Sequence, residues 1–214
     1  TNGNFGVGNS FDARANVTGT GQILASGDVA QALTGAVSNG GTANASMAFG
    51  NIHVGDVVTQ QYSIANSGSN GPALRGAIQT NVNGGKLTDG RLSGSGVTAG
   101  NFGPIAAAGA AVQDVTFTGS TAGALSGQSV AVVNNFDNVA EQVLSVSGAV
   151  FRYANPSVHT PEPVNFGNRR VGDVTSQAVS LTNNVANDGF SERLDASIGG
   201  VTGNATSNGG SFSL

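Results

Sequence analysis

Residues 49–57 read Phe49-Gly50-Asn51-Ile52-His53-Val54-Gly55-Asp56-Val57, and residues 166–174 repeat them as Phe166-Gly167-Asn168-Arg169-Arg170-Val171-Gly172-Asp173-Val174. The similarity continues to residues 67 and 184, and 10 of the 19 aligned positions are identical. Ten identities in 19 positions exceed chance agreement, even in a chain that uses a few residue types heavily. The sequence therefore contains an internal repeat with a spacing of 117 residues.

The repeated stretch predicts a strand, a turn and a second strand. Gly55 supplies the positive φ that a tight turn needs, and Asp56 can bond to the nearby backbone. The β-branched and aromatic residues of 57–65 favour a strand. Further β-rich runs follow at residues 112–118, 128–133 and 142–150, and the last two flank a hairpin loop at 134–138. Helical periodicity is nearly absent.

About seven short strands in each repeat, separated by regular turn signals, are typical of an immunoglobulin-like β-sandwich. The chain has no Cys and no Trp, so it lacks the disulfide and the buried Trp of antibody domains. We therefore predict an all-β fold of tandem immunoglobulin-like β-sandwich domains with little or no helix.

The pattern F-G-N-x-x-V-G-D-x-x-x-Q-x-x-x-(I/L)-x-N resembles the opening of ASH-type (ASPM, SPD-2, Hydin) domains. It is similar in particular to repeats of bacterial surface proteins known as the choice-of-anchor D family. The resemblance covers residues 45–153 once and residues 162–214 in part. It implies a non-catalytic β-sandwich that serves as a building or interaction module, because the motif specifies a fold rather than an activity.

The repeat also suggests how the chain is divided. We expect residues 45–153 to form a complete sandwich and residues 162–214 to form a partial one that lacks its closing strands. Residues 22–29 resemble residues 142–150, so we expect residues 1–36 to be a terminal β-hairpin of a preceding or partner domain. Two explanations stay open. The chain is a stretch of a longer tandem array, or residues 1–31 of one copy complete the partial sandwich of the next copy by strand addition.

The composition excludes several classes of protein. Gly accounts for 34 of the 214 residues, but without the G-X-Y period of collagen. Only 9% of residues are charged, and the single adjacent basic pair is Arg169-Arg170, so we expect no nucleic-acid partner. The longest apolar stretch, residues 105–112, is far shorter than the roughly 18 residues that read as a membrane span. Without Cys there is no thiolate zinc site.

The sequence offers few residues for chemistry. His53 and His159 are the only histidines, and we expect neither to have a carboxylate at ligand spacing. Residues 94–99 fit G-x-G-x-x-A, but no βαβ context surrounds them. Asp56 and Asp173 share one repeat position, which is compatible with calcium at the turns, although a turn-forming role explains both without an ion. We predict no catalytic, cofactor-binding or metal site, and therefore no enzyme.

These observations favour an extracellular, cell-surface structural protein of bacterial origin: a fibre subunit, a stalk or an adhesin segment. Its expected partners are further copies of itself, joined head to tail, or other surface proteins. The first alternative is a carbohydrate- or protein-binding accessory module of a larger surface enzyme. Exposed aromatics would support that alternative, but the chain has only Tyr62 and Tyr153 and no Trp. The second alternative is a microtubule- or cilium-associated scaffold, although such surfaces are usually richer in Lys and Arg.

Overall fold

The computed structural model describes residues 33–34, 37–38, 44–66, 72–135, 141–207 and 211–213. The predicted terminal hairpin of residues 1–36 lies outside these residues except for 33–34, and so it stays a prediction. The described residues contain no helix long and apolar enough to cross a membrane.

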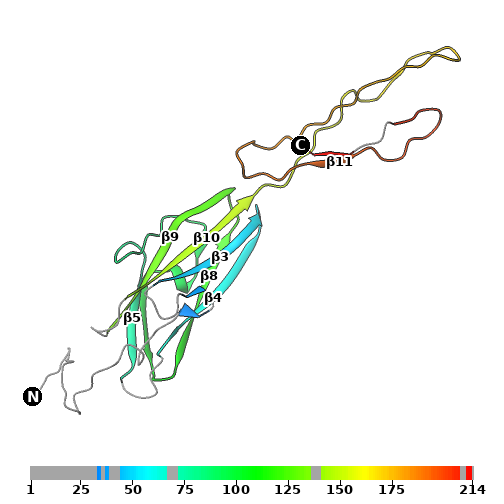
Figure 1. The fold of residues 1–214 in the computed structure, drawn as a ribbon. Coiled ribbons are helices and arrows are strands. Elements are labelled where there is room, and N and C mark those ends of the chain that lie inside the picture. The colour runs from blue at the N-terminus through cyan, green and yellow to red at the C-terminus, as the bar shows by residue number, and fades with distance from the viewer. Residues whose placement is uncertain are drawn as a thin grey trace, which may run out of the picture.

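Two β-sheets form the body of the protein (Figure 1). The four-stranded sheet has the order β1 (Leu33–Thr34), β4 (Val57–Ala65), β8 (Ala110–Thr118) and β6 (Leu92–Ser93). The six-stranded sheet has the order β2 (Val37–Ser38), β3 (Asn44–His53), β10 (Gln142–Phe151), β9 (Gly123–Asn134), β5 (Leu74–Gln79) and β7 (Gly100–Ile105). A 3-10 turn at Ser95–Val97 is the single helical element among the described residues. The predicted all-β class is confirmed, whereas its tandem arrangement stays a prediction.

Three predicted strand runs lie inside observed strands: residues 112–118 in β8, residues 128–133 in β9 and residues 142–150 in β10. Strands β9 and β10 pair antiparallel, as the expected hairpin requires, and Val143 lies opposite Ala131. Strand β10 also pairs with β3, in parallel, over nearly the whole length of both strands. The β10–β3 pair therefore lies inside the six-stranded sheet, and β3 contains the first residues of the repeat motif.

The core lies between the two sheets, and both sheets contribute to it. Along β4, burial alternates so that Tyr62 and Ile64 point inward. From the six-stranded sheet, Met47, Leu144 and other apolar residues pack against them. Phe49 of the motif is also buried, and its ring centroid lies 5.4 Å from that of Phe117.

The turn of the repeat motif carries the chain from one sheet to the other, because β3 and β4 belong to different sheets. Backbone bonds hold this turn in place. The Val54 N–H donates to the Phe151 carbonyl at 2.9 Å, and the Gly55 N–H donates to the Gly119 carbonyl at 2.8 Å. In return, the Gly119 N–H donates to the Asp56 carbonyl at 2.8 Å. The first copy of the motif is thus tied to the ends of both sheets.

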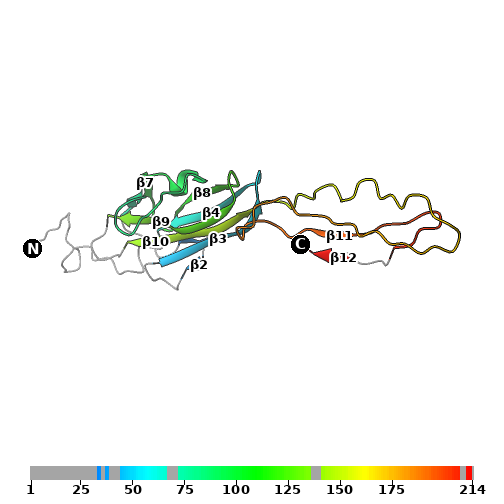
Figure 2. The ribbon, with the colours of Figure 1, turned by 90° about the horizontal axis from the view of Figure 1, so that it is seen from above.

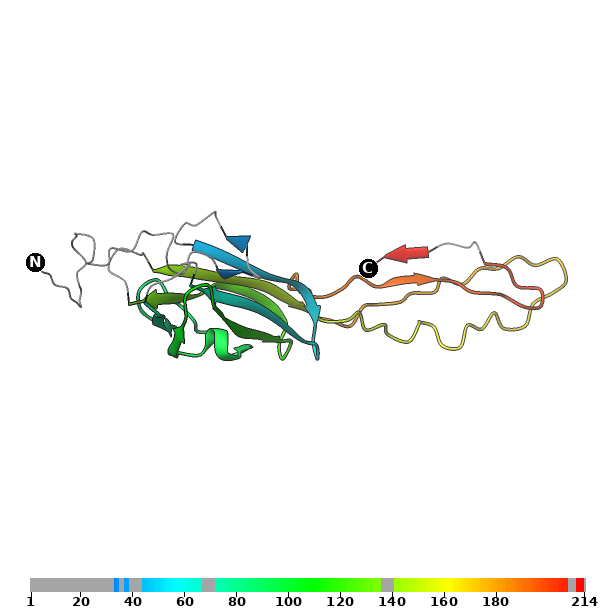
Figure 3. The same cartoon turned by 90° about the horizontal axis from the view of Figure 1, so that it is seen from below.

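The second copy repeats the turn but has different surroundings. Gly55 and Gly172 have φ values of 102° and 96°, which a residue with a side chain rarely adopts. Residues 154–207 form extended segments that project from the end of the sandwich where β10 ends (Figures 2 and 3). The segments are joined by isolated bridges, such as Thr160 with Ser180. Strand β11 (Asp195–Ser197) pairs with β12 (Ser211–Ser213). The partial sandwich of residues 162–214 stays a prediction.

Candidate functional site

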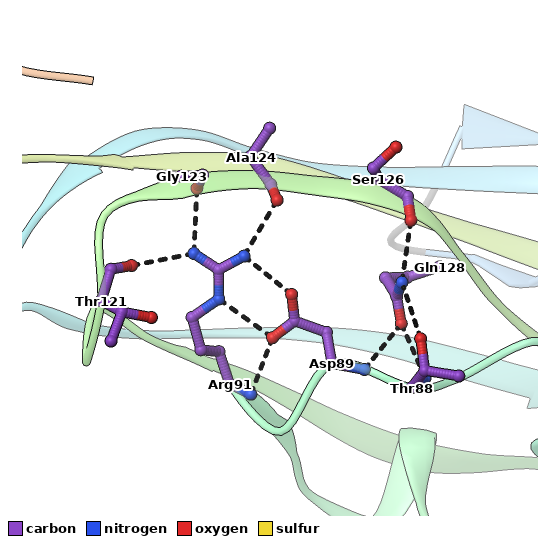
Figure 4. Close-up of polar contacts among 8 residues, drawn as sticks. All are labelled: Thr88, Asp89, Arg91, Thr121, Gly123, Ala124, Ser126 and Gln128. Atoms are coloured by element: carbon purple, nitrogen blue, oxygen red, sulfur yellow. Dashed lines mark hydrogen bonds and ion pairs between the residues drawn. The ribbon is translucent and has the colours of Figure 1, made fainter. Parts of the chain in front are cut away.

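The most highly connected polar cluster of the sandwich surrounds Arg91 (Figure 4). It lines an open hollow of about 610 Å³ between residues 88–91, which precede β6, and the turn that leads into β9. The side chains of Asp89 and Arg91 are 19% and 10% exposed, and their ion pair measures 2.7 Å from Asp89 Oδ2 to Arg91 Nη2. By position, this hollow is a candidate for a ligand site.

All five N–H donors of the Arg91 guanidinium are already used. Nε donates to Asp89 Oδ1 at 2.9 Å, and Nη2 donates to Asp89 Oδ2 and to the Ala124 carbonyl. Nη1 donates to the carbonyls of Thr121 and Gly123, each at 2.9 Å. A guanidinium has five such donors, so none is left to receive an anionic ligand. Arg91 therefore joins the turn before β9 to the loop before β6 through hydrogen bonds.

The carboxylate and the amide of the same cluster are also satisfied. The bond from Arg91 lowers the pKa of Asp89 and outweighs the opposing effect of burial. Gln128 accepts bonds through Oε1 from the N–H groups of Thr88 and Asp89, at 2.9 and 3.0 Å, and donates through Nε2 to the Ser126 carbonyl. An ionised, fully bonded Asp is not poised for proton transfer. The cluster is a structural clamp on the loop.

Residues 94–99, which fit a dinucleotide-binding pattern, have a packing role. They form the 3-10 turn at Ser95–Val97, and the Tyr62 hydroxyl donates to the Gly96 carbonyl at 2.9 Å. A Cβ at Gly96 would lie 2.6 Å from a ring carbon of Tyr62, so the ring needs this glycine. Burial raises the pKa of Tyr62, which stays a neutral hydrogen-bond donor.

The expectation that neither histidine has a nearby carboxylate is wrong. His53 Nε2 lies 2.9 Å from Glu192 Oε1, and His159 Nε2 lies 2.6 Å from Glu162 Oε2. Glu162 follows His159 by three positions, a signal that the sequence offered, whereas Glu192 is 139 positions from His53. Among the described residues, no three or more His, Asp or Glu side chains are grouped so that they could hold a metal ion.

Asp56 and Asp173 occupy equivalent turns and make equivalent bonds. Oδ2 of Asp56 accepts from the His53 N–H at 2.7 Å, and Oδ2 of Asp173 accepts from the Arg170 N–H at 3.0 Å. Each carboxylate thus satisfies a backbone donor inside its own turn. The turn-forming role accounts for both residues without a cation.

The two copies of the motif differ most in the exposure of their apolar residues. Tyr62 is 1% exposed, and its counterpart Val179 is 44% exposed; Met47 is 2% exposed, and its counterpart Val164 is 38% exposed. Phe166 and Leu181, the counterparts of the buried Phe49 and Ile64, are half-buried. We call these four second-copy residues the apolar row: Val164, Phe166, Val179 and Leu181. The apolar row is a candidate interaction surface, because every counterpart is a core residue.

No protein-family model matches the sequence, and no curated protein matches it. Among solved structures, the chain is similar to the ASH/PapD-like domain of human CEP192 (PapD-like domain 7). The identity is 14%, the match covers 50% of this chain and 81% of that chain, and the TM-score is 0.36. The narrower assignment to the bacterial choice-of-anchor D family stays a prediction.

Proposed function

We propose that this chain is a non-catalytic structural protein whose β-sandwich units build a fibre, a stalk or an adhesin on the outside of a bacterial cell. The observation that carries the proposal is the repeated motif, which forms the same turn twice. Met47 and Tyr62 are buried in the first copy, whereas their counterparts Val164 and Val179 are exposed in the second. An uncovered copy of a core surface is suited to association with another strand. The extracellular setting rests on the composition: a single Lys and a surplus of Gly, Asn, Ser and Thr.

The polar side chains of the sandwich support a non-catalytic role. The Arg91 cluster uses its donors and acceptors to hold its own loop, and Tyr62 bonds to a backbone carbonyl in the core. An enzyme site needs a group left free to bind or to exchange protons with a substrate. Neither of these two places supplies such a group.

The proposed mode of assembly is strand complementation between copies. In the first unit, β10 lies beside β3 and helps to bury Met47. Residues 22–29 resemble residues 142–150 of β10, so they are a suitable donor for the apolar row of a second copy. Residues 1–31 of one chain would then complete residues 162–214 of the next. Contacts of this kind do not close on themselves, and they propagate a filament.

Negative-stain microscopy of the purified chain tests the proposal. We expect uniform fibres from the full chain and unpolymerised protein after deletion of residues 1–31. Val179→Asp places a charge in the apolar row and should also abolish fibres. The matched control is Val82→Asp, because Val82 is comparably exposed but lies in a loop of the sandwich, and that variant should still polymerise. Fibres from the truncated chain would contradict strand complementation.

The same preparation tests the accessory-module alternative. Monodisperse particles that are retained on a glycan array would favour it over a fibre. Tyr62 is buried, so Tyr153 is the one exposed tyrosine, and its ring stacks on His53 at a centroid distance of 4.1 Å. Among the described side chains, one exposed aromatic ring gives a glycan a small stacking surface, which is why we place the structural role first.

A further inference from the structure

The connection between the sandwich and the second copy, residues 152–155, is held by backbone hydrogen bonds at both of its ends. Strand β10 ends at Phe151, and the Arg152 N–H donates to the Phe190 carbonyl at 2.9 Å while the Glu192 N–H donates to the Arg152 carbonyl at 2.9 Å. Three residues later, the Asn184 N–H donates to the Asn155 carbonyl at 2.7 Å. The connection therefore has backbone partners from residues 183–192 along its length, unlike a free linker.

Side chains reinforce the same contact. Arg152 Nη1 lies 2.9 Å from both carboxylate oxygens of Asp188. The rings of Phe151 and Phe190 lie 5.8 Å apart in a tilted arrangement that is favourable for aromatic pairs. The Phe190 N–H bonds to Asp188, and this bond, together with Arg152, lowers the pKa of the Asp188 carboxyl. The segment 188–190 is thus held in the shape that meets the end of β10.

A third element, the end of β3, joins this contact through His53. The imidazole bonds to Glu192 at 2.9 Å and stacks on the ring of Tyr153 at an interplanar angle of 13°. Residues 53, 151–153 and 188–192 therefore meet at one place, which we call the junction. They come from the end of β3, the end of β10 and a loop of the second copy.

The composition of the connection agrees with a fixed junction. Flexible linkers are rich in Gly and Ser, whereas residues 152–155 read Arg-Tyr-Ala-Asn. The ion pairs are partly exposed, so water screens them and each contributes little by itself. Two backbone bonds, one ring pair and one ring stack act at the same place, and together they oppose rotation about the connection.

We propose that residues 53 and 151–153 are a docking surface at the end of the sandwich which receives residues 188–192 of the following unit, and that the resulting junction fixes the angle between the two units. In the array that our proposed function assumes, each unit would then follow the last at one set angle, and the assembly would be a stiff rod. With a flexible junction, the angle between neighbouring units would vary and the assembly would bend freely.

Distance measurements between two spin labels test the junction on the single chain. The protein has no Cys, so Val112→Cys in β8 and Val158→Cys beyond the connection introduce the only labelling sites, and both positions are exposed. Double electron–electron resonance should give one narrow distance distribution. Arg152→Ala combined with Phe190→Ala removes the ion pair and the ring pair and should replace the narrow peak with a broad distribution.

Two further variants calibrate the result. A Gly-Ser insertion after Tyr153 shows the distribution of a free connection, and Arg169→Ala, which removes an exposed arginine away from the junction, should leave the narrow peak unchanged. A broad distribution in the parent chain, matching that of the insertion, overturns the fixed junction. The labelled chain is mixed with an excess of unlabelled chain so that the labels report on one molecule in fibres as well as in unassembled protein. A failure to form fibres would then overturn the proposed function and leave this measurement unaffected.

Discussion

The two copies of the repeat motif share their turn and differ in their surroundings. Both turns use a glycine with φ near 100° and an Asp that accepts a bond from the backbone three residues earlier. Tyr62 and Met47 nevertheless lie in the core, whereas their counterparts Val179 and Val164 are exposed to solvent. Short-range sequence thus determines the turn, and distant strands such as β8 and β10 determine burial. The comparison separates local folding from packing within one chain.

The largest expected effect comes from truncating equivalent residues of the two copies. Tyr62→Ala removes a buried ring and leaves the Gly96 carbonyl without its donor, so we expect the free energy of unfolding to fall by about 3–5 kcal/mol. Val179→Ala removes an exposed side chain, and the change should stay within about 0.5 kcal/mol. Urea unfolding, in which the unfolding transition of the sandwich is monitored, measures both changes in free energy.

The same two substitutions, Tyr62→Ala and Val179→Ala, distinguish an apolar row that is buried by a donor strand from one that is exposed to solvent. In assembled fibres, Val179→Ala should lower the dissociation temperature, because a donor strand would then bury that position. Equal losses from the two substitutions in unassembled protein would show that Val179 is already buried and that the contrast between the copies is wrong.

The second prediction concerns a clamp that the second copy lacks. Asp89 and Arg91 correspond by the 117-residue spacing to Thr206 and Asn208, which cannot form this ion pair. Arg91→Ala leaves Asp89 without its partner and frees three carbonyls, so we expect a loss of about 2–4 kcal/mol in the unfolding free energy of the sandwich. Arg169→Ala, at an exposed position of the second copy, should leave it unchanged.

The clamp also predicts a dependence on pH. The pKa of Asp89 is lower in the folded state than its ordinary value of about 3.9, so its contribution is present above about pH 4 and is lost as the pH falls through the folded-state value. Asp188 has a lowered pKa too, and for that reason the measurement is the difference between the parent chain and Arg91→Ala. That difference should shrink in acid. A constant difference would contradict the role of the ion pair.

The sequence predicted what neighbouring residues determine and missed what depends on distant contacts. The turn at Gly55 and the strand runs both follow from local pattern and composition. Neither the contact of His53 with Glu192 nor the use of all five donors by Arg91 could be predicted. Glu192 is 139 positions from His53. Asp89 lies only two positions from Arg91, but the other three Arg91 partners are backbone carbonyls of residues 121–124, whose sequence identity carries no signal.

An effect smaller than those of Tyr62→Ala and Arg91→Ala is expected where the two copies are most alike. An added Cβ at Gly55 or Gly172 meets no atom within 4 Å, so Gly→Ala at either position acts through the positive φ alone. We expect a cost of about 1–2 kcal/mol at each turn. Gly55→Ala should appear as lost stability of the sandwich, and Gly172→Ala as faster hydrogen exchange of the Asp173 amide, which bonds to the Arg170 carbonyl. If Gly172→Ala leaves that exchange unchanged, the second turn does not form as the first does, and the two copies share a sequence without sharing a structure.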